Sequence, residues 1–168
     1  MYILIAKESS IIALSNGRLC EFDNDMNLIK TGDLMFSKFF GRFQIFAKLL
    51  RKIVYSIKKI SDDIFIISNG NGIFCLDSSN LSLRQIKTST EFKKCLSIGL
   101  VTINGCDNII YSDYYANLKK SAISIYVAPI NDLDNYNLIY TFEENTINHI
   151  HSFFQDPNTK DIFFNVGD

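Results

Sequence analysis

One short strand-and-turn unit recurs along this 168-residue sequence and limits the folds open to it more than any other feature. In each unit an apolar strand ends at a Ser or Asn, a second strand follows, and a turn rich in Asp and Asn leads to another strand. The fourth unit is only begun. The first strands of the four units are Ile11–Leu14, Ile64–Ile67, Asn108–Tyr111 and Asp161–Phe164.

The spacing of these units predicts the architecture. From Ser15, which follows the first strand, the step is 53 residues to Ser68, then 44 to Ser112 and 53 to Asn165. Units of roughly 40 to 50 residues with about four strands each are typical of β-propeller blades. We therefore expect an all-β fold built from propeller blades.

The strand candidates are runs rich in Ile, Phe, Tyr and Val, separated by Asn, Asp, Ser and Gly turns. Strands and helices do not alternate, and no G-x-G-x-x-G or G-x-x-x-x-G-K-[ST] sequence occurs, which argues against a nucleotide-binding α/β fold. The predicted strands are Tyr2–Ala6, Ile11–Leu14, Arg18–Phe22, Ile53–Ile57, Ile64–Ile67, Ile73–Leu76, Leu81–Ile86, Leu96–Thr102, Ile109–Tyr111, Ile123–Val127, Leu138–Phe142, His149–Phe154 and Ile162–Val166.

We expect one domain over residues 1–168, with units at about 1–34, 51–90 and 91–145 and an incomplete unit at 146–168. A propeller typically needs about four to eight blades to close its ring, and this length holds a little over three. The sequence therefore predicts an incomplete β-propeller of about three four-stranded blades. Its terminal blades would expose unpaired strand edges, through which we expect self-association.

One basic segment departs from the strand pattern. Between Ser37 and Ile60 there are seven basic residues and no acidic ones, interleaved with Phe and Leu. Apolar spacing of i, i+3, i+4 and i+7 predicts a short amphipathic helix near residues 35–50. This helix would either pack its Phe side chains on the propeller or dock on an anionic surface, and we favour packing.

Charge and composition narrow the partners. The 17 Lys and Arg residues nearly balance 18 Asp and Glu, so the chain lacks the basic excess that nucleic-acid binding would need. Its four cysteines have no C-x-x-C spacing, which predicts free thiols rather than a zinc site. Without a basic leader or a run of about 20 apolar residues, we expect a cytoplasmic protein with no transmembrane segment and no cofactor.

Both histidines of the chain lie in one tripeptide, His149-Ile150-His151. On a strand the two imidazoles share a face, where they could bind a metal, contact a substrate or play a structural part. Asp113 and Asp168 are the carboxylates that could work with them as acid and base, while Asp156 lies in a sequence typical of a turn.

Three tyrosines surround Asp113 in the sequence: Tyr111, Tyr114 and Tyr115. Such a polar-aromatic cluster can stack on sugar rings, so these residues are candidates for substrate binding. Tyrosines of this kind also pack between blades, and packing is the favoured interpretation for any one of them.

The segment from Asn104 to Asp168 resembles the sialidase-like, BNR-repeat type of bacterial β-propeller. Asn108–Asp113 resembles the G-x-I-Y-Y-G-E-Y strand of that family. His149–Phe154, with the Asp-Pro turn after it, resembles the I-x-H-I-H strand, and Ile162–Val166 with its Gly-Asp resembles the strand that ends in T-G-D. The resemblance implies binding or hydrolysis of a glycan or related polar ligand at the channel mouth.

The sequence departs from sialidases in two respects. The segment Ala128–Leu138 stands where S-x-D-x-G-x-T-W would fall, and only four arginines are available for a carboxylate-binding triad. No complete catalytic set is visible, and sialic acid cleavage is not supported. The alternatives to a carbohydrate-binding or glycosidase-like propeller are a noncatalytic scaffold for protein–protein interaction and an inactive truncated product.

Overall fold

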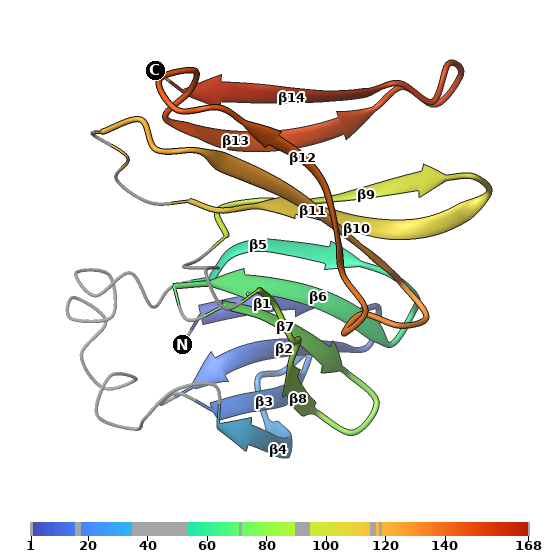
Figure 1. Ribbon diagram of the computed structural model, residues 1–168. Coiled ribbons are helices and arrows are strands. Elements are labelled where there is room, and N and C mark those ends of the chain that lie inside the picture. Colours follow the sequence, from blue (N-terminus) through green and yellow to red (C-terminus); the bar gives the residue numbers. More distant parts are fainter. Residues whose placement is uncertain are drawn as a thin grey trace.

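The chain is all-β in a computed structural model that describes residues 2–15, 18–34, 54–70, 72–89, 95–114, 117 and 119–167. Within these ranges there are fourteen strands and no helix (Figure 1). The helix expected near residues 35–50 lies outside the described residues.

Strands that follow one another in sequence lie side by side in each sheet, with antiparallel pairing throughout the described residues. Three sheets have four strands and the last has two. The first sheet contains β1 (Tyr2–Ala6), β2 (Ser10–Ser15), β3 (Arg18–Asp23) and β4 (Leu28–Leu34). The second contains β5 (Val54–Lys59), β6 (Ile64–Asn69), β7 (Gly72–Asp77) and β8 (Ser82–Gln85). The third contains β9 (Ile98–Ile103), β10 (Cys106–Ser112), β11 (Ile123–Pro129) and β12 (Asn137–Phe142), and the hairpin contains β13 (His149–Gln155) and β14 (Ile162–Gly167).

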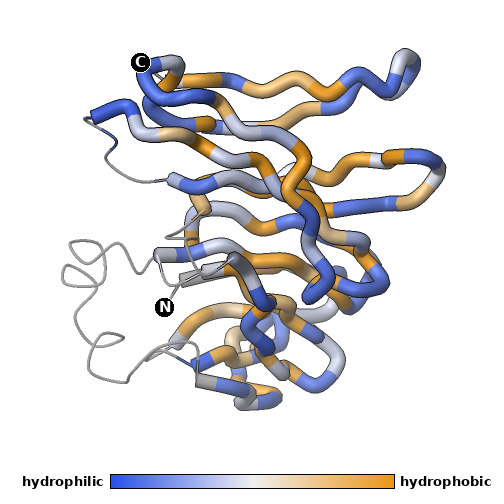
Figure 2. The backbone as a smooth tube through the Cα atoms, viewed as in Figure 1, coloured by the Kyte–Doolittle hydropathy of each residue, from blue (hydrophilic) through white to orange (hydrophobic). Residues whose placement is uncertain are grey.

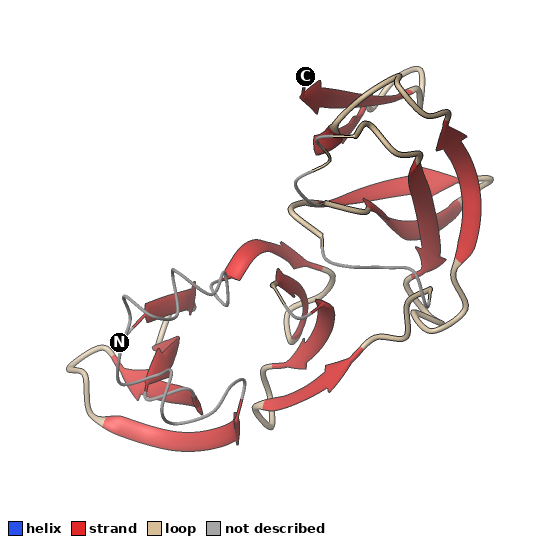
Figure 3. Cartoon of the chain, turned by 60° about the vertical axis from the view of Figure 1, so that its left-hand side comes forward, coloured by secondary structure: helices blue, strands red, loops and turns tan. Residues whose placement is uncertain are grey.

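The sheets pack face to face in sequence order along an open arc (Figures 1 and 3). The first strand of the third sheet, β9, lies between β5 and β13, the first strands of its neighbours. Face-to-face sheets with their first strands side by side are the arrangement of propeller blades. The described chain is therefore three blades plus a hairpin, which confirms the predicted all-β, incomplete β-propeller.

Apolar side chains fill the spaces between successive sheets, and most of them come from the middle strands. The colouring of the backbone in Figure 2 shows apolar residues along these strands. This follows from the period of two along a strand, because alternate residues of a middle strand face the blade on either side. The cluster between the first two blades includes Ile12, Leu19 and Leu76, and the cluster between the second and third includes Ile73, Ile109 and Tyr111.

Polar contacts join the first two blades at their outer strands. The Leu83 amide donates to Oδ2 of Asp33 at 2.7 Å, and the Asp33 amide donates to the Leu81 carbonyl at 3.0 Å. A Cβ on Gly32 would lie 2.3 Å from the Leu81 carbonyl oxygen, so β4 can approach this closely only with glycine at that position.

A second close approach joins the hairpin to the third blade. A Cβ on Gly99 would lie 2.6 Å from Cγ2 of Ile110 and 2.7 Å from Cβ of Phe153, which places β13 directly against β9. The Gln155 side-chain amide accepts from the Thr102 amide at 2.8 Å and donates to the Thr102 carbonyl at 3.0 Å. It therefore binds the backbone of β9 as a neighbouring strand would.

The four cysteines are free thiols, as predicted. Among the described residues, no helix is long and apolar enough to cross a membrane.

Candidate functional site

The two histidines meet at the open end of the hairpin. His149 pairs with Gly167 and Ile150 with Val166, but the next pair is Ser152 with Asn165, so His151 is the extra residue of a β-bulge. Nε2 of His149 and Nε2 of His151 lie 3.1 Å apart, with the ring planes at 84°. The structure therefore brings both imidazoles together, while Ile150 is buried at 2% exposure.

His149 is the more enclosed member of the pair. Its ring makes an edge contact with Tyr114 at a centroid distance of 4.9 Å, and its Nδ1 is buried with no hydrogen-bond partner among the described atoms. Burial, and to a smaller extent the neighbouring His151, lower the pKa of His149 below its ordinary value. The neutral imidazole is thus the form that this environment favours.

Gly167 leaves room for the pair. A Cβ at this position would lie 2.6 Å from Nε2 of His149 and 2.6 Å from Nε2 of His151. The backbone of Gly167 is not in the left-handed region that favours glycine, so the two rings, rather than its φ angle, exclude a larger residue. In the sequence Gly167 is only the glycine of the Gly-Asp pair after Val166, and its place beside both rings depends on the hairpin register.

The two described candidate carboxylates, Asp113 and Asp156, have different surroundings. Asp156 lies at the turn of the hairpin, at the end remote from His149, where its Oδ1 accepts from the amides of Asn158 and Thr159. These bonds lower the pKa of Asp156, as expected for a turn residue. Asp113 is buried just after β10, and Asp168 lies outside the described residues. The described part of the chain holds no group of three or more metal-ligating side chains.

The three predicted tyrosines have different surroundings. Tyr111 is fully buried between the second and third blades, where its ring stacks on Tyr126 at 5.6 Å and burial raises its pKa. Tyr114 is partly exposed beside His149, and Tyr115 lies outside the described residues. Of the two described tyrosines, only Tyr114 is placed to contact a ligand near the histidines.

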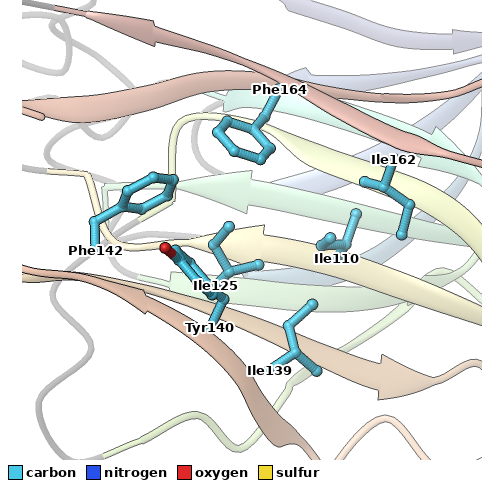
Figure 4. A pocket seen from close by; sticks show the side chains of 7 residues that line it. All are labelled: Ile110, Ile125, Ile139, Tyr140, Phe142, Ile162 and Phe164. Atoms are coloured by element: carbon cyan, nitrogen blue, oxygen red, sulfur yellow. The ribbon is translucent and has the colours of Figure 1, made fainter.

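A second feature, not predicted from the sequence, is an apolar pocket between the third blade and β14 (Figure 4). Its volume is about 310 Å³, and its wall contains no charged side chain. Three of its residues are substantially exposed: Ile139 at 47%, Tyr140 at 55% and Phe164 at 39%. The pocket is lined by Ile110, Ile125, Ile139, Tyr140, Phe142, Ile162 and Phe164.

The pocket exists because the two strands of the hairpin cannot cover all four strands of the third blade. The hairpin covers the inner part of the third blade, where Ile150 and Phe153 pack on its apolar cluster. The outer strand β12 stays open, and a bulge at Ile139 adds one more apolar side chain to the pocket wall. The uninterrupted run Ile162-Phe163-Phe164, apolar on both faces of a strand, was the sequence signal for a surface that needs cover.

The sequence matches no protein-family model and no curated protein. Several solved structures match most of this chain, and three of them are described here. The N-terminal domain of Nup159 has 10% identity and a TM-score of 0.43, over 91% of this chain and 35% of that one. A chain of the S. cerevisiae complex of a Dbp5 variant bound to Nup159, a Gle1 variant, IP6 and ADP has 11% identity and a TM-score of 0.44, over 93% and 37%. The extracellular domain of the one-component system BT4673 from B. thetaiotaomicron has 16% identity and a TM-score of 0.39, over 96% and 25%. This chain therefore spans between 25% and 37% of the length of these matches.

Proposed function

We propose that this chain is a noncatalytic propeller module that binds an extended polypeptide segment by strand addition to β14. The observation that carries the proposal is the half-covered third blade. Three sheets of the described chain have four strands, whereas the hairpin has two and leaves an apolar pocket open beside its edge. A polypeptide that added strands to this edge would cover the pocket at the same time.

The edge of β14 is suited to such pairing. Within the described residues β14 pairs only with β13, and no described strand pairs with its other edge. Its sequence, IFFNVG, contains neither a charged residue nor a proline. Edge strands of monomeric proteins usually carry such residues to prevent pairing with other chains, and their absence supports an edge that a partner covers.

The chemistry of the partner follows from the pocket wall. The partner strand needs small or aromatic apolar side chains at alternate positions facing the pocket, and no charge there, because burying an unpaired charge is costly. The third blade shows a suitable pattern, since Tyr126 and Ala128 of β11 face the second blade from alternate positions. We therefore expect the partner to resemble the outer half of a blade.

A peptide comprising residues 123–142, the β11–β12 segment, tests the proposal as a probe for the outer half of a blade. We expect saturable binding to the folded chain, together with slowed amide hydrogen exchange in β14. Phe164→Glu should weaken binding by about tenfold or more, because a charge then faces the pocket. Phe163→Glu is the matched control, since Phe163 is 54% exposed and does not line the pocket.

Two results would count against the proposal. One is a folded protein that binds no peptide and shows no protection of β14. The other is equal weakening by the two Phe substitutions, which would mean that the pocket does not take part in binding.

A second candidate function is binding of a glycan or related polar ligand beside the histidines. It is favoured by the partly exposed Tyr114–His149 ring contact and by the sialidase-like resemblance. Glycan arrays and glycosidase assays on the wild type and a His149→Ala, His151→Ala double variant test this candidate. Loss of ligand binding in a folded double variant would support it, and the absence of any binding or turnover in the wild type would reject it.

A further inference from the structure

The open end of the hairpin lies under the two histidine rings. His149 and Gly167 form its last strand pair, and the Asn148 amide donates to the Gly167 carbonyl at 3.1 Å. Nε2 of His149 and Nε2 of His151 lie 3.1 Å apart, which is hydrogen-bond distance. A Cβ on Gly167 would meet both nitrogens, so the bonded rings lie directly on the end of β14.

A hydrogen bond between two imidazole rings needs one N–H and one lone pair, and the surroundings assign these roles. Nδ1 of His149 is buried and has no hydrogen-bond partner among the described atoms. Because a buried N–H without an acceptor is costly, the proton of His149 is at Nε2, and this atom donates to Nε2 of His151. His151 is exposed, so its Nδ1–H can donate to water.

This bond has room for one added proton but not for two. With one added proton, a lone pair remains on one of the two Nε2 atoms and can still accept. With two, both Nε2 atoms are donors and both rings are positive, so the rings repel each other at close range. Gly167, beneath both rings, is the part of β14 that their separation disturbs first.

No described carboxylate offsets these charges. The ring of His149 is faced by His151 on its own strand, by Tyr114 from the segment after β10, and by the backbone of Gly167 on β14. Of the described residues, no Asp or Glu forms a hydrogen bond or an ion pair with either ring. Tyrosine stays neutral over the range in which histidine changes its charge, so among these groups the two imidazoles respond to pH there.

We propose that His149 and His151 form a proton-operated latch that holds the end of β14 against β13 and opens when both rings are protonated. The latch is closed at neutral pH and opens as the pH falls below about 6.5, where histidine gains its proton. Burial lowers the pKa of His149, so the second proton binds only below that pH. Control of polypeptide binding by the latch rests on the proposed function, because β14 supplies the pairing edge, but the latch itself does not.

Hydrogen exchange of backbone amides tests the latch in the full chain at about pH 7.5 and about pH 5. His151→Gln is the matched variant, because its side-chain carbonyl is an acceptor that takes up no proton in this range. At the lower pH we expect the Asn148 amide to exchange about threefold or more faster in the wild type than in the variant, since its hydrogen bond to Gly167 is released. The two proteins should not differ at the higher pH.

The other end of the hairpin provides an internal control. There the Asp156 amide donates to the Asp161 carbonyl at 2.9 Å, remote from the rings, and it should exchange equally in both proteins. Equal exchange of the Asn148 amide in the wild type and the variant at the lower pH would overturn the latch.

Nitrogen NMR of the imidazole rings is a second test, and it needs no variant. At the higher pH we expect His149 to carry its proton at Nε2 and His151 at Nδ1. The same tautomer in both rings would overturn the latch, because the two Nε2 atoms would then be two donors or two acceptors.

Binding of the 123–142 peptide at the two pH values separates the latch from the proposed function. We expect the wild type to bind about threefold or more weakly at the lower pH, and His151→Gln to lose less affinity. Equal affinity of the wild type at both pH values would overturn control of binding by the latch. Absence of binding at both would reject the proposed function, and the exchange of the Asn148 amide would still decide whether the latch exists.

Discussion

The two faces of the third blade are built from similar residues but have different surroundings. On the face toward the second blade, Ile98, Ile109 and Tyr111 are 0% exposed. On the face toward the hairpin, Ile110 and Ile125 are buried near the inner strands, but Tyr140 on β12 is 55% exposed. The four strands of the second blade cover the first face, whereas only the two strands of the hairpin cover the second face.

This difference shows that burial in the third blade depends on the neighbouring sheet rather than on the blade's own sequence. Its middle strands are apolar on both faces, as expected for a sheet packed on both sides. Only the face toward the second blade has this packing over all four strands. Substitutions that change one face at a time therefore separate the contribution of each neighbour.

The largest expected effect is on the covered face. Ile109→Ala should lower the free energy of unfolding by about 2–5 kcal/mol, because a cavity would remain in a fully packed cluster. Urea denaturation measures the loss. A cost under about 1 kcal/mol would show that the contact between the second and third blades is looser than described.

The next effect concerns the close approach of the hairpin. Gly99→Ala should cost about 1–3 kcal/mol, since the added methyl group meets Ile110 and the Cβ of Phe153 and pushes β13 from β9. Hydrogen exchange should increase in β13 and β14 while the first two blades keep their protection. Leu100→Ala, at a 38% exposed neighbouring position, is the control and should leave β13 in place. Unchanged exchange in the Gly99 variant would contradict the prediction.

The third effect concerns the amide that joins the hairpin to β9. Gln155→Leu should lower the free energy of unfolding by about 1–3 kcal/mol, because it leaves the Thr102 amide without its acceptor. Gln155→Glu keeps an acceptor for that amide but loses the donor to the Thr102 carbonyl, so it separates the two bonds. If both variants unfold like the wild type in urea, the amide does not hold the hairpin.

A smaller effect is expected from pH at the open end of the hairpin. The pKa of His149 is lowered from 6.5, so the unfolded chain binds a proton at a higher pH than the folded one. Stability from this residue is complete above about pH 6.5 and falls as the pH decreases below it. His149→Gln should make the melting temperature depend less on pH between about pH 5 and 7 than it does in the wild type. If the melting temperature of the variant depends on pH as strongly as that of the wild type, other groups cause the effect.

The smallest effect is expected on the open face. Ile139→Ala removes the same atoms as Ile109→Ala from a 47% exposed side chain, and should change the free energy of unfolding by only about 0.5 kcal/mol. It should nevertheless reduce the binding of an apolar dye such as ANS to the pocket. A large loss of stability would mean that this face is already covered.

The sequence was sufficient to predict the blades because most of their strands either alternate apolar and polar residues or are apolar throughout, and clear turn sequences separate them. The outer strand β4 was missing from the predicted strands, since Leu28 and Ile29 are followed by Lys30, Thr31, Gly32 and Asp33. Those polar residues contact the second blade: Nζ of Lys30 donates to the Ser79 carbonyl, and Asp33 accepts from Leu83. An outer strand has little apolar surface to bury, so its sequence carries a weak strand signal.

The candidate sites were only partly predictable. The period of two along a strand was enough to put His149 and His151 on one face, but the bulge at His151 and the position of Gly167 depend on pairing with β14. The apolar pocket depends on how far a two-stranded hairpin extends over a four-stranded sheet. The run Ile162-Phe163-Phe164 indicates an apolar surface, but no local pattern gives the register of the hairpin or the extent of its cover.

The strand order within the sheets also has a consequence for how the chain folds. Each sheet consists of consecutive strands, so every hydrogen-bonded ladder closes within a short stretch of chain. Each blade can therefore assemble as soon as its own strands have left the ribosome, before the next blade is synthesised. Cooperativity then passes from one blade to the next only through their shared apolar clusters, as in a one-dimensional array.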